Sequence, residues 1–268
     1  MIRTAAPEDA ELLAALHDRW RREWPEFSHE SPEGVRSAIT DDGMLYLLLD
    51  ERATVCLHAD HAHAYGYLDF PYADAADAPE LIGAALEHLP GLRVECPLPA
   101  QCEWEAQMLI RQGFTPGRRQ RRMTLKQWPA SQPLTVPDGI EHAPVFPDEV
   151  EALHDLAFKG NAKMPGWRTD PGIFPVIGLR TSEGAVGYAL VALHGGAFWL
   201  WELAVHPEWR QRGLGRILTL LALNVLRNAG AEEVHVNVNE DHDQQAPTLY
   251  QSVGFQTAHL ITRYVQQR

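Results

Sequence analysis

One stretch of the sequence decides the fold, residues 203–216, which read LAVHPEWRQRGLGR. A run typical of a β-strand ends at Pro207, a turn rich in arginine and glycine follows, and a strongly apolar segment comes next. In that segment Leu214 and Leu218 recur at helical spacing and further leucines form a second stripe, which predicts a helix buried on most of its surface. The stretch therefore predicts a strand that passes through a glycine turn into a buried helix.

The glycine turn has the chemistry of an anion site. Gly213 and Gly215 let the backbone approach a ligand closely, and the start of the helix leaves amide N–H groups without acceptors inside the helix. The helix dipole adds positive potential there, and Arg210, Arg212 and Arg216 add charge. The alternative is a solvated strand-to-helix turn, but the flanking strand and helix favour a cradle for a diphosphate.

Composition limits the classes of protein that the chain can belong to. Its 268 residues, 45% hydrophobic and 22% charged, predict a globular protein of two units rather than a disordered or fibrous chain. The net charge of −13 repels nucleic acid at long range. No apolar run is long enough to span a membrane or act as a signal peptide, and the three cysteines lack a CxxC spacing. We expect a cytoplasmic protein with reduced thiols and no nucleic-acid or membrane partner.

The chain divides almost in half at residues 126–139, a connector with three prolines. Each half opens with a proline and two acids at a helix start (7–9 and 147–149) and closes with a Gly-Phe pair, 113–114 or 254–255. The pattern predicts an α/β (α+β) unit repeated twice, each with a mixed, mostly antiparallel sheet flanked by helices. The predicted strands before the second helix are 44–49, 54–58 and 64–70 in the first half, and 174–179, 186–193 and 198–205 in the second.

Two motifs in the second half carry a family resemblance. RQRGLG at 210–215 matches the Q/R-x-x-G-x-G/A pyrophosphate loop of the GNAT superfamily of N-acetyltransferases, and the strand before it also matches. APTLYQSVGF at 246–255 resembles the family's A-x-x-L-Y-x-x-x-G-F segment, in the family's order. The resemblance runs from about Pro137 to the C-terminus. Over residues 1–126 only the order of elements and the Gly-Phe ending carry it.

The resemblance implies acetyl-CoA, or another acyl-CoA, as co-substrate, with no metal. It implies direct attack by a primary amine of a small molecule or peptide in a ternary complex, with a strand N–H that stabilises the developing oxyanion. It also implies that the strand at 203–205 pairs with the pantetheine arm and that the glycine turn holds the pyrophosphate. The predicted co-substrate contacts are Leu203, Ala204, Val205, Arg210, Gln211, Arg212, Gly213, Leu214, Gly215 and Arg216.

There are two catalytic candidates: the resemblance places Tyr250, and the predicted strand itself offers Glu202. Tyr250 stands where a tyrosine often protonates the departing thiolate, and phenol and thiol have unperturbed pKa values within about two units. Its alternative role is a packing aromatic. Glu202 is the obvious carboxylate for a general base, but strand alternation puts 199, 201 and 203 on one face and Glu202 on the other. Glu202 therefore remains a candidate whose predicted face is the opposite one.

The acceptor pocket is predicted at Trp199 and Trp201, which match positions that face the amine in relatives. Indoles cannot act as a base, but they can line an apolar or cation-binding pocket. The alternative is that both tryptophans belong to the core. Asn237, Asn239 and the acidic cluster at 240–243 are further candidates for polar groups near the pocket, although a solvated turn is the more common form of such a cluster.

The first half lacks this chemistry. After its third strand comes the acidic segment 72–80, with no RxxGxG, and Leu109 stands where the second half has Tyr250. We therefore predict a degenerate GNAT-like domain at 1–126, a linker at 127–138 and a GNAT acetyltransferase domain at 139–268. This resembles tandem GNAT proteins of the mycothiol synthase type, whose C-terminal half carries catalysis. The acceptor is predicted between the first half, the loop 160–169 and the tryptophan face.

Several alternatives stay open. A CoA-binding regulatory or interaction protein without turnover, or a donor with another acyl group, would use the same motifs. Homodimer formation is compatible with the sequence. His58, Asp60, His61 and His63 have ligand chemistry, but their expected strand-turn-strand would point them apart. Finally, the arginines at 118–122 predict a solvated strand edge rather than a phosphate site.

Overall fold

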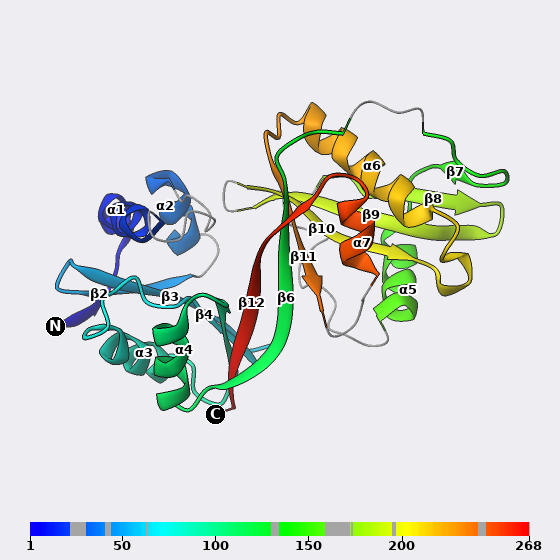
Figure 1. The fold of residues 1–268 in the computed structure, drawn as a ribbon. Coiled ribbons are helices and arrows are strands. Elements are labelled where there is room, and N and C mark those ends of the chain that lie inside the picture. The colour runs from blue at the N-terminus through cyan, green and yellow to red at the C-terminus, as the bar shows by residue number, and fades with distance from the viewer. Residues whose placement is uncertain are drawn as a thin grey trace. The chain divides into compact units, whose positions relative to one another are not determined.

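Helices and strands follow one another in two similar series along the chain (Figure 1). The computed structural model describes residues 1–21, 31–40, 44–62, 64–129, 134–158, 172, 174–194, 197–240 and 245–267. The first series is β1 (Ile2–Thr4), a 3-10 turn (Pro7–Asp9), α1 (Ala10–Arg21), α2 (Pro32–Thr40), β2 (Leu45–Leu49), β3 (Ala53–Asp60), β4 (Tyr65–Leu68), α3 (Ala78–Glu87), β5 (Arg93–Pro99), α4 (Glu103–Arg111) and β6 (Thr115–Leu125). The second series is β7 (Glu141–His142), α5 (Pro147–Phe158), β8 (Ile177–Thr181), β9 (Gly184–His194), β10 (Ala197–Val205), a 3-10 turn (Pro207–Trp209), α6 (Leu214–Asn228), β11 (Val234–Asn239), α7 (Ala246–Gln251) and β12 (Gln256–Gln267).

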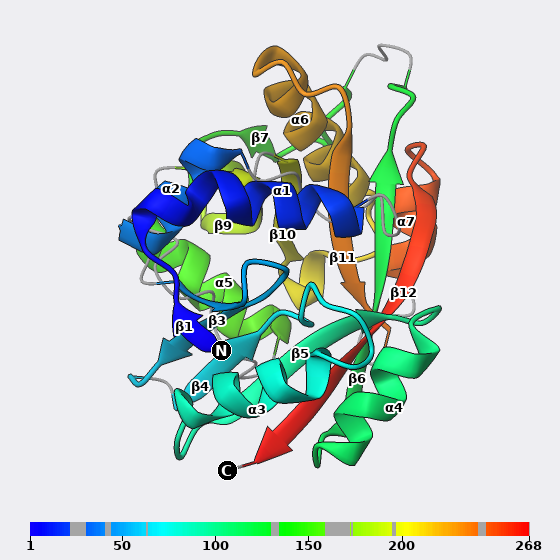
Figure 2. The same cartoon turned by 90° about the vertical axis from the view of Figure 1, so that its left-hand side faces the viewer.

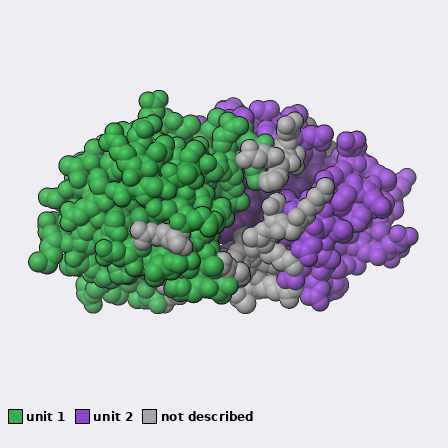
Figure 3. All heavy atoms as spheres, turned by 90° about the horizontal axis from the view of Figure 1, so that it is seen from below, with its two compact units in different colours: residues 1–120, 239–241, 259–268 green, residues 121–238, 242–258 purple. Residues whose placement is uncertain are grey.

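The chain forms two compact units, coloured separately in Figure 3. Unit 1 consists of residues 1–120, 239–241 and 259–268, and unit 2 of residues 121–238 and 242–258. The boundary therefore falls within β6, and the C-terminal part of β12 belongs to unit 1. The predicted domains 1–126 and 139–268 with their linker at 127–138 stay a prediction.

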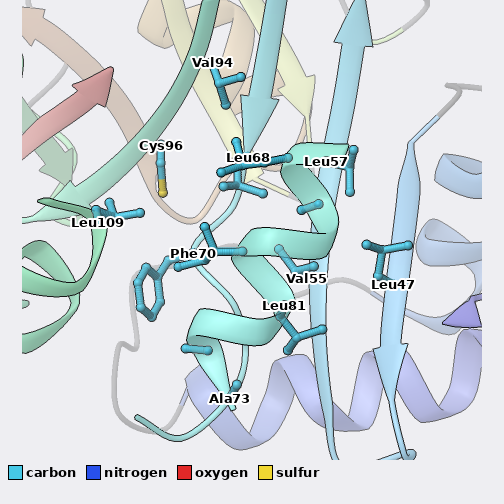
Figure 4. Packing of buried hydrophobic residues seen from close by; sticks show 14 of the residues in the cluster. Leu47, Val55, Leu57, Leu68, Phe70, Ala73, Leu81, Val94, Cys96 and Leu109 are labelled. Atoms are coloured by element: carbon cyan, nitrogen blue, oxygen red, sulfur yellow. The ribbon is translucent and has the colours of Figure 1, made fainter. Parts of the chain in front are cut away.

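Unit 1 is a sheet with helices against both faces. Its strands follow the order β1-β2-β3-β4-β5-β12, antiparallel except for the parallel pair β4 and β5. Side chains alternate between the two faces of β2, which sends Leu47 to one core and Leu48 to the other. The first core includes residues of α3 and α4 (Figure 4), and the second lies under the adjacent helices α1 and α2 (Figure 2).

Unit 2 repeats this plan in the order β6-β11-β10-β9-β8-β7. The parallel pair is β10 and β11, while β7, β8, β9 and β10 pair antiparallel in turn. Helices α6 and α7 share the larger core with one face of the sheet, and α5 packs on the other face against Tyr188, Leu190 and Ala204. The buried stripe of α6 includes Leu214 and Leu218, as predicted.

The predicted fold class is confirmed. Both halves are mixed sheets flanked by helices, and every strand expected before the second helix of each half is present within a few residues of its predicted bounds. The predicted solvated edge at 118–122 is wrong, because β6 is hydrogen-bonded to β12 on one side and to β11 on the other. A single sequence gives no sign of this, since strand order is set by tertiary packing. Across the described part of the chain, no helix has the length and apolar character needed to cross a membrane.

Candidate active site

The first feature of the site is an opening between two parallel strands. Strand β10 pairs with β9 from Ala197 to Val205, but it pairs with β11 only at Phe198 and Trp199. Beyond Trp199 the β11-facing edge of β10 has no strand partner in the described part of the chain. Unpaired strand edges are templates for an extended ligand. The predicted pantetheine contacts, residues 203–205, lie on this edge.

A β-bulge at Trp201 sets the faces of β10. Leu200 is opposite Val191 on β9 and Glu202 is opposite Leu190, so Trp201 is the extra residue of a bulge in this register. Directly opposed residues share a face, and Leu190 lies on the α5 face whereas Val191 lies on the α6 face.

The bulge overturns the predicted arrangement of β10 side chains. Glu202 was expected on the other face of the strand from Trp199, Trp201 and Leu203, but the extra residue resets the alternation of side chains. Glu202 instead shares the α5 face with both tryptophans, and Leu203 packs into the core under α6. The acceptor face predicted from relatives therefore carries a carboxylate.

Glu202 belongs to a buried cluster with one residue from β9 and one from α5. Its Oε1 lies 3.0 Å from Nδ1 of His154 and accepts a hydrogen bond from the hydroxyl of Tyr188. The side chains of His154 and Glu202 are 6% and 18% exposed. Burial, followed by the charge of Glu202 and its hydrogen bond, raises the pKa of Tyr188 far above its ordinary value, so the phenol stays protonated.

Neither partner of Glu202 was named from the sequence. A signal existed for His154, because it lies four residues after Val150 on the buried stripe of α5, where a histidine needs a polar partner. No signal existed for Tyr188, since its approach to Glu202 depends on the bulge.

The tryptophan face also holds a cation supplied by the chain itself. The guanidinium of Arg122 lies 4.8 Å from the centre of the Trp199 ring, and its Nε donates to Oδ1 of Asn237 at 3.1 Å. The ring of His235 lies 5.1 Å from that of Trp199. Trp199 and Trp201 are both half-buried. Their role as walls of the acceptor pocket stays a prediction, and Arg122 and His235 join them there without having been named from the sequence.

The glycine turn has the expected backbone. Gly213 has φ 80° and directly precedes α6, and Gln211 has φ 61°. The first bond of the helix runs from the amide of Ile217 to the carbonyl of Gly213 (3.1 Å), so earlier amides have no acceptor within the helix. Gly215 has another function, because a Cβ there would lie 3.2 Å from a methyl group of Leu249 on α7. The turn thus requires glycine once for conformation and once for packing.

The three arginines of the turn differ in what they contact. Arg210 donates to the carbonyls of Val205 and Ala157, both at 3.2 Å, which fastens the turn to the ends of β10 and α5. The guanidinium of Arg212 lies 4.6 Å from the centre of the Trp209 ring, and Arg216 is exposed. As pyrophosphate ligands all three stay predictions, and Arg210 has donors committed to the protein.

Tyr250 lies on α7 and its side chain reaches into the core under α6. The residue is 7% exposed, and its ring makes an edge contact with Phe255 at 5.6 Å between ring centres. This position suits either role considered from the sequence, a proton donor at the edge of the site or a packing aromatic. The catalytic role stays a prediction.

Other sequence candidates fall outside the described residues or do not converge. The loop 160–169, residues 241–243 and His63 are not described. His58 and Asp60 lie on β3, and no group of three or more potential metal ligands occurs among the described residues.

Comparison with known sequences supports the family resemblance found in the second half of the chain. The model of the family described as "Acetyltransferase (GNAT) family" matches residues 139–255. A protein of Nocardiopsis dassonvillei named Mycothiol acetyltransferase is 46% identical over 56 residues, which is 21% of this chain and 17% of that protein. Its namesake of Mycobacterium marinum is 28% identical over 188 residues, 57% of this chain and 58% of that protein. The matches thus span less than two thirds of these curated relatives.

Comparison with solved structures supports the fold of the whole chain. A GCN5-related N-acetyltransferase from Sphaerobacter thermophilus has a TM-score of 0.76 at 18% identity, covering 100% of this chain and 95% of that one. A tandem GNAT protein from the clavulanic acid biosynthesis pathway has a TM-score of 0.75 at 14% identity, covering 100% and 98%. At such identities the likeness shows the fold alone.

Proposed function

We propose that the protein transfers an acetyl group from acetyl-CoA to a primary amine, on the ground that residues 139–255 match the model of the GNAT acetyltransferase family and that the chain has the fold of a tandem GNAT protein. The acceptor is a small molecule or peptide, it attacks directly in a ternary complex, and catalysis belongs to unit 2. The name borne by the relatives, Mycothiol acetyltransferase, supports acetyl transfer.

One observation carries the proposal. Strand β10 separates from β11 immediately after Trp199 and leads, through the turn at Gly213, into the start of α6. A strand edge offers amides and carbonyls in a row to an extended amide-containing chain, and a helix start offers amides to phosphate. Acetyl-CoA has both parts in one molecule, a pantetheine arm and a pyrophosphate.

The residues present fit this co-substrate. The edge at 203–205 would hold the pantetheine arm, and the backbone of 211–215 would hold the pyrophosphate with Arg212 and Arg216 beside it. A net charge of −13 makes such local positive charge necessary for an anionic ligand. Arg210 would contribute by fixing the turn through Val205 and Ala157 rather than by binding phosphate.

Two side chains would move protons. Bound acetyl-CoA supplies an activated acetyl thioester. Glu202 would accept a proton from the acceptor ammonium, and its position on the same face as Trp199 and Trp201 supports this role. Tyr250 would donate a proton at the thiolate side. Lack of a carboxylate on the acceptor face would favour the alternative, a CoA-binding protein without turnover, but the bulge at Trp201 brings Glu202 to the face of the tryptophans.

An assay with the purified full chain tests the proposal. Acetyl-CoA is incubated with a panel of primary amines that includes amino sugars, amino acids and peptides with free N-termini. Release of free CoA thiol is measured, and mass spectrometry looks for one added acetyl group on the amine. We expect thiol release that depends on one class of amine. The ligand that copurifies with the protein, identified by mass spectrometry, checks the acyl group.

Two results would count against the proposal. Acetyl-CoA binding by calorimetry with no transfer to any amine would favour the regulatory protein without turnover. Absence of acetyl-CoA binding would refute the site itself.

A further inference from the structure

The buried cluster around Glu202 has a defined direction for each hydrogen bond. An ionised carboxylate only accepts hydrogen bonds, so both of its partners must donate. His154 therefore carries a proton on Nδ1, 3.0 Å from Oε1 of Glu202. The hydroxyl of Tyr188 also donates to Oε1. The hydroxyl lies 3.5 Å from Nδ1 of His154, which makes the contact between the two donors the weakest of the three.

Both donors are fixed in the protein interior. Tyr188 lies in the core between β9, β10 and α5, and it is completely buried. His154 is 5% exposed, and its ring packs 4.8 Å from that of Phe158 on the same helix. A carboxylate with little exposure loses hydration, and two hydrogen bonds to charged oxygen offset that loss. The cluster thus holds one oxygen of Glu202 in place.

Among the described residues, the titratable groups shown to act on Glu202 and Tyr188 lie on the two elements packed against β10. Helix α5 contributes His154 and Asp155, and strand β9 contributes Tyr188. The charge of Asp155 acts in the same direction as that of Glu202, because it also raises the pKa of Tyr188. The phenol is therefore a permanent donor over the working range of pH, and it cannot take the proton from Glu202.

We propose that His154 and Tyr188 are positioning residues that hold Glu202 as an oriented carboxylate on the tryptophan face, ready to take a proton from the acceptor ammonium. This inference rests on the proposed function. In the step, an N–H bond of the ammonium breaks, its electron pair stays on nitrogen, and the proton passes to a carboxylate oxygen of Glu202. The two donors remain bonded to Oε1 throughout, so the group does not have to reorient before each turnover.

The first experiment measures the cluster without reference to activity. In the full chain labelled with ¹⁵N-histidine, the signals of His154 are assigned by their loss in His154→Asn. We expect the tautomer with the proton on Nδ1 in the wild type, and loss of that preference in Glu202→Leu. The tautomer with the proton on Nε2 would overturn the proposal whether or not the protein is an acetyltransferase.

The second experiment measures turnover with the best amine of the panel. Tyr188→Phe should lower kcat about tenfold, since a hydrogen bond to a charged group contributes at least a factor of that size. Because a hydrogen bond to the charged form of a carboxyl favours that form, loss of the donor should move the acid limb of the pH profile to higher pH. The acetyl-CoA Kd should stay unchanged. Tyr46→Phe is the matched control, because Tyr46 is equally buried but lies in the core of unit 1.

Variants of His154 separate positioning from packing. His154→Leu removes the donor, whereas His154→Asn retains an N–H near the position of Nδ1. We expect kcat to be lower in His154→Leu than in His154→Asn. Equal loss in both variants, or an unchanged acid limb in Tyr188→Phe of an active enzyme, would show a merely structural cluster. A wild type without turnover would refute the proposed function, and the tautomer result would then decide the positioning geometry alone.

Discussion

Strand β4 of unit 1 pairs with β5 at Tyr65, Gly66 and Tyr67, nearly its whole length, whereas β10 of unit 2 pairs with β11 only at Phe198 and Trp199. The antiparallel partner differs as well. Strand β3 pairs with β4 in an unbroken register, while β9 and β10 are interrupted by the bulge at Trp201. The same strand pair is therefore closed in one unit and open in the other.

The turn that leads from this strand into the next helix also differs between the two units. In unit 1 a carboxylate of the chain occupies the turn before α3, where Oδ1 of Asp74 accepts the amides of Ala76 and Asp77 at 3.0 Å each. In unit 2 the corresponding turn contains Gly213 and Gly215 with arginines on either side. Unit 1 thus supplies an anion from its own sequence where unit 2 leaves space for one. The difference teaches that two units with the same order of strands can have different turns before the helix, and the proposed anion site belongs to unit 2 alone.

The end of the last helix has the same hydrogen bond and the same glycine conformation in both units. The amide of Phe114 bonds to the carbonyl of Leu109 at 3.0 Å, and the amide of Phe255 to the carbonyl of Tyr250 at 3.1 Å. The glycine before each phenylalanine has positive φ, 88° at Gly113 and 105° in the second unit. Leu109 and Tyr250 are therefore equivalent positions, as predicted from the sequence.

The largest expected effect comes from filling the open turn of unit 2. Gly213→Glu should abolish measurable acetyl-CoA binding in calorimetry, because it places a negative charge and a strained residue where the pyrophosphate would lie. Gly230→Glu is the matched control. Gly230 has φ 90°, and like Gly213 it has no neighbour within 4 Å of an added Cβ, but it lies at the other end of α6. Equal loss in both variants would point to misfolding rather than to a binding turn.

A smaller effect is expected where the equivalent positions 109 and 250 differ. Tyr250→Phe should lower kcat about a hundredfold, the lower range for a general acid, with the acetyl-CoA Kd unchanged. Leu109→Tyr should give unit 1 no activity, because that unit has neither the open strand edge nor the glycine turn. Steady-state rates and calorimetry on both variants check this. A Tyr250→Phe enzyme with wild-type kcat would assign that tyrosine to packing alone.

Features that depend on local sequence could be predicted well. The strands, the buried stripe of α6 and the Gly-Phe endings follow from hydrophobic period and from the preference of glycine for positive φ. The glycine turn before α6 was predicted in the same way. Each of these features is decided by residues that lie close together in the sequence.

Features that depend on pairing across strands could not be predicted. The face predicted for Glu202 was wrong because one extra residue in β10 moves every side chain after it to the other face of the strand. The amino-acid composition of a strand does not reveal such a bulge. The arginines at 118–122 were placed on an edge because strand order is a tertiary property. Tyr188 was missed for the same reason, since only the pairing of β9 with β10 brings it to Glu202.

The shared helix endings predict equal stability effects in the two units. Replacement of either glycine, in Gly113→Ala or Gly254→Ala, places a Cβ on a residue with positive φ. This costs about 1–2 kcal/mol of stability. An added Cβ would approach a flexible side-chain end in both cases, Gln266 at 3.0 Å and Leu125 at 3.1 Å. Urea unfolding of both variants should show similar losses. A much smaller loss at Gly113 would mean that the ending of α4 is less constrained than that of α7.

The smallest expected effect concerns the helix starts that the two units share. Asp9 accepts the amide of Ala6 at 2.8 Å and Glu149 accepts that of Phe146 at 3.0 Å, and each carboxylate also binds an arginine. The hydrogen bond from Arg3 is the main cause that lowers the pKa of Asp9 to about 2, and Arg180 likewise lowers the pKa of Glu149. A carboxyl whose pKa is lowered by folding stabilises the fold at pH values above its pKa in the unfolded chain, which is 3.8 for Asp9 and 4.5 for Glu149. This contribution is lost as the pH falls through the pKa of the folded state.

Asp9→Asn and Glu149→Gln test this equivalence through pH. Each variant should unfold at a lower urea concentration than the wild type at pH 6, by less than either glycine variant because exposed ion pairs are screened by solvent. The difference from the wild type should shrink as pH falls from 5 toward 2, since the wild-type carboxyl then becomes neutral as well. A difference that stays constant over this range would mean that the charge of the carboxylate is not what distinguishes the variants from the wild type. The two units would then share the geometry of the helix start without sharing its electrostatics.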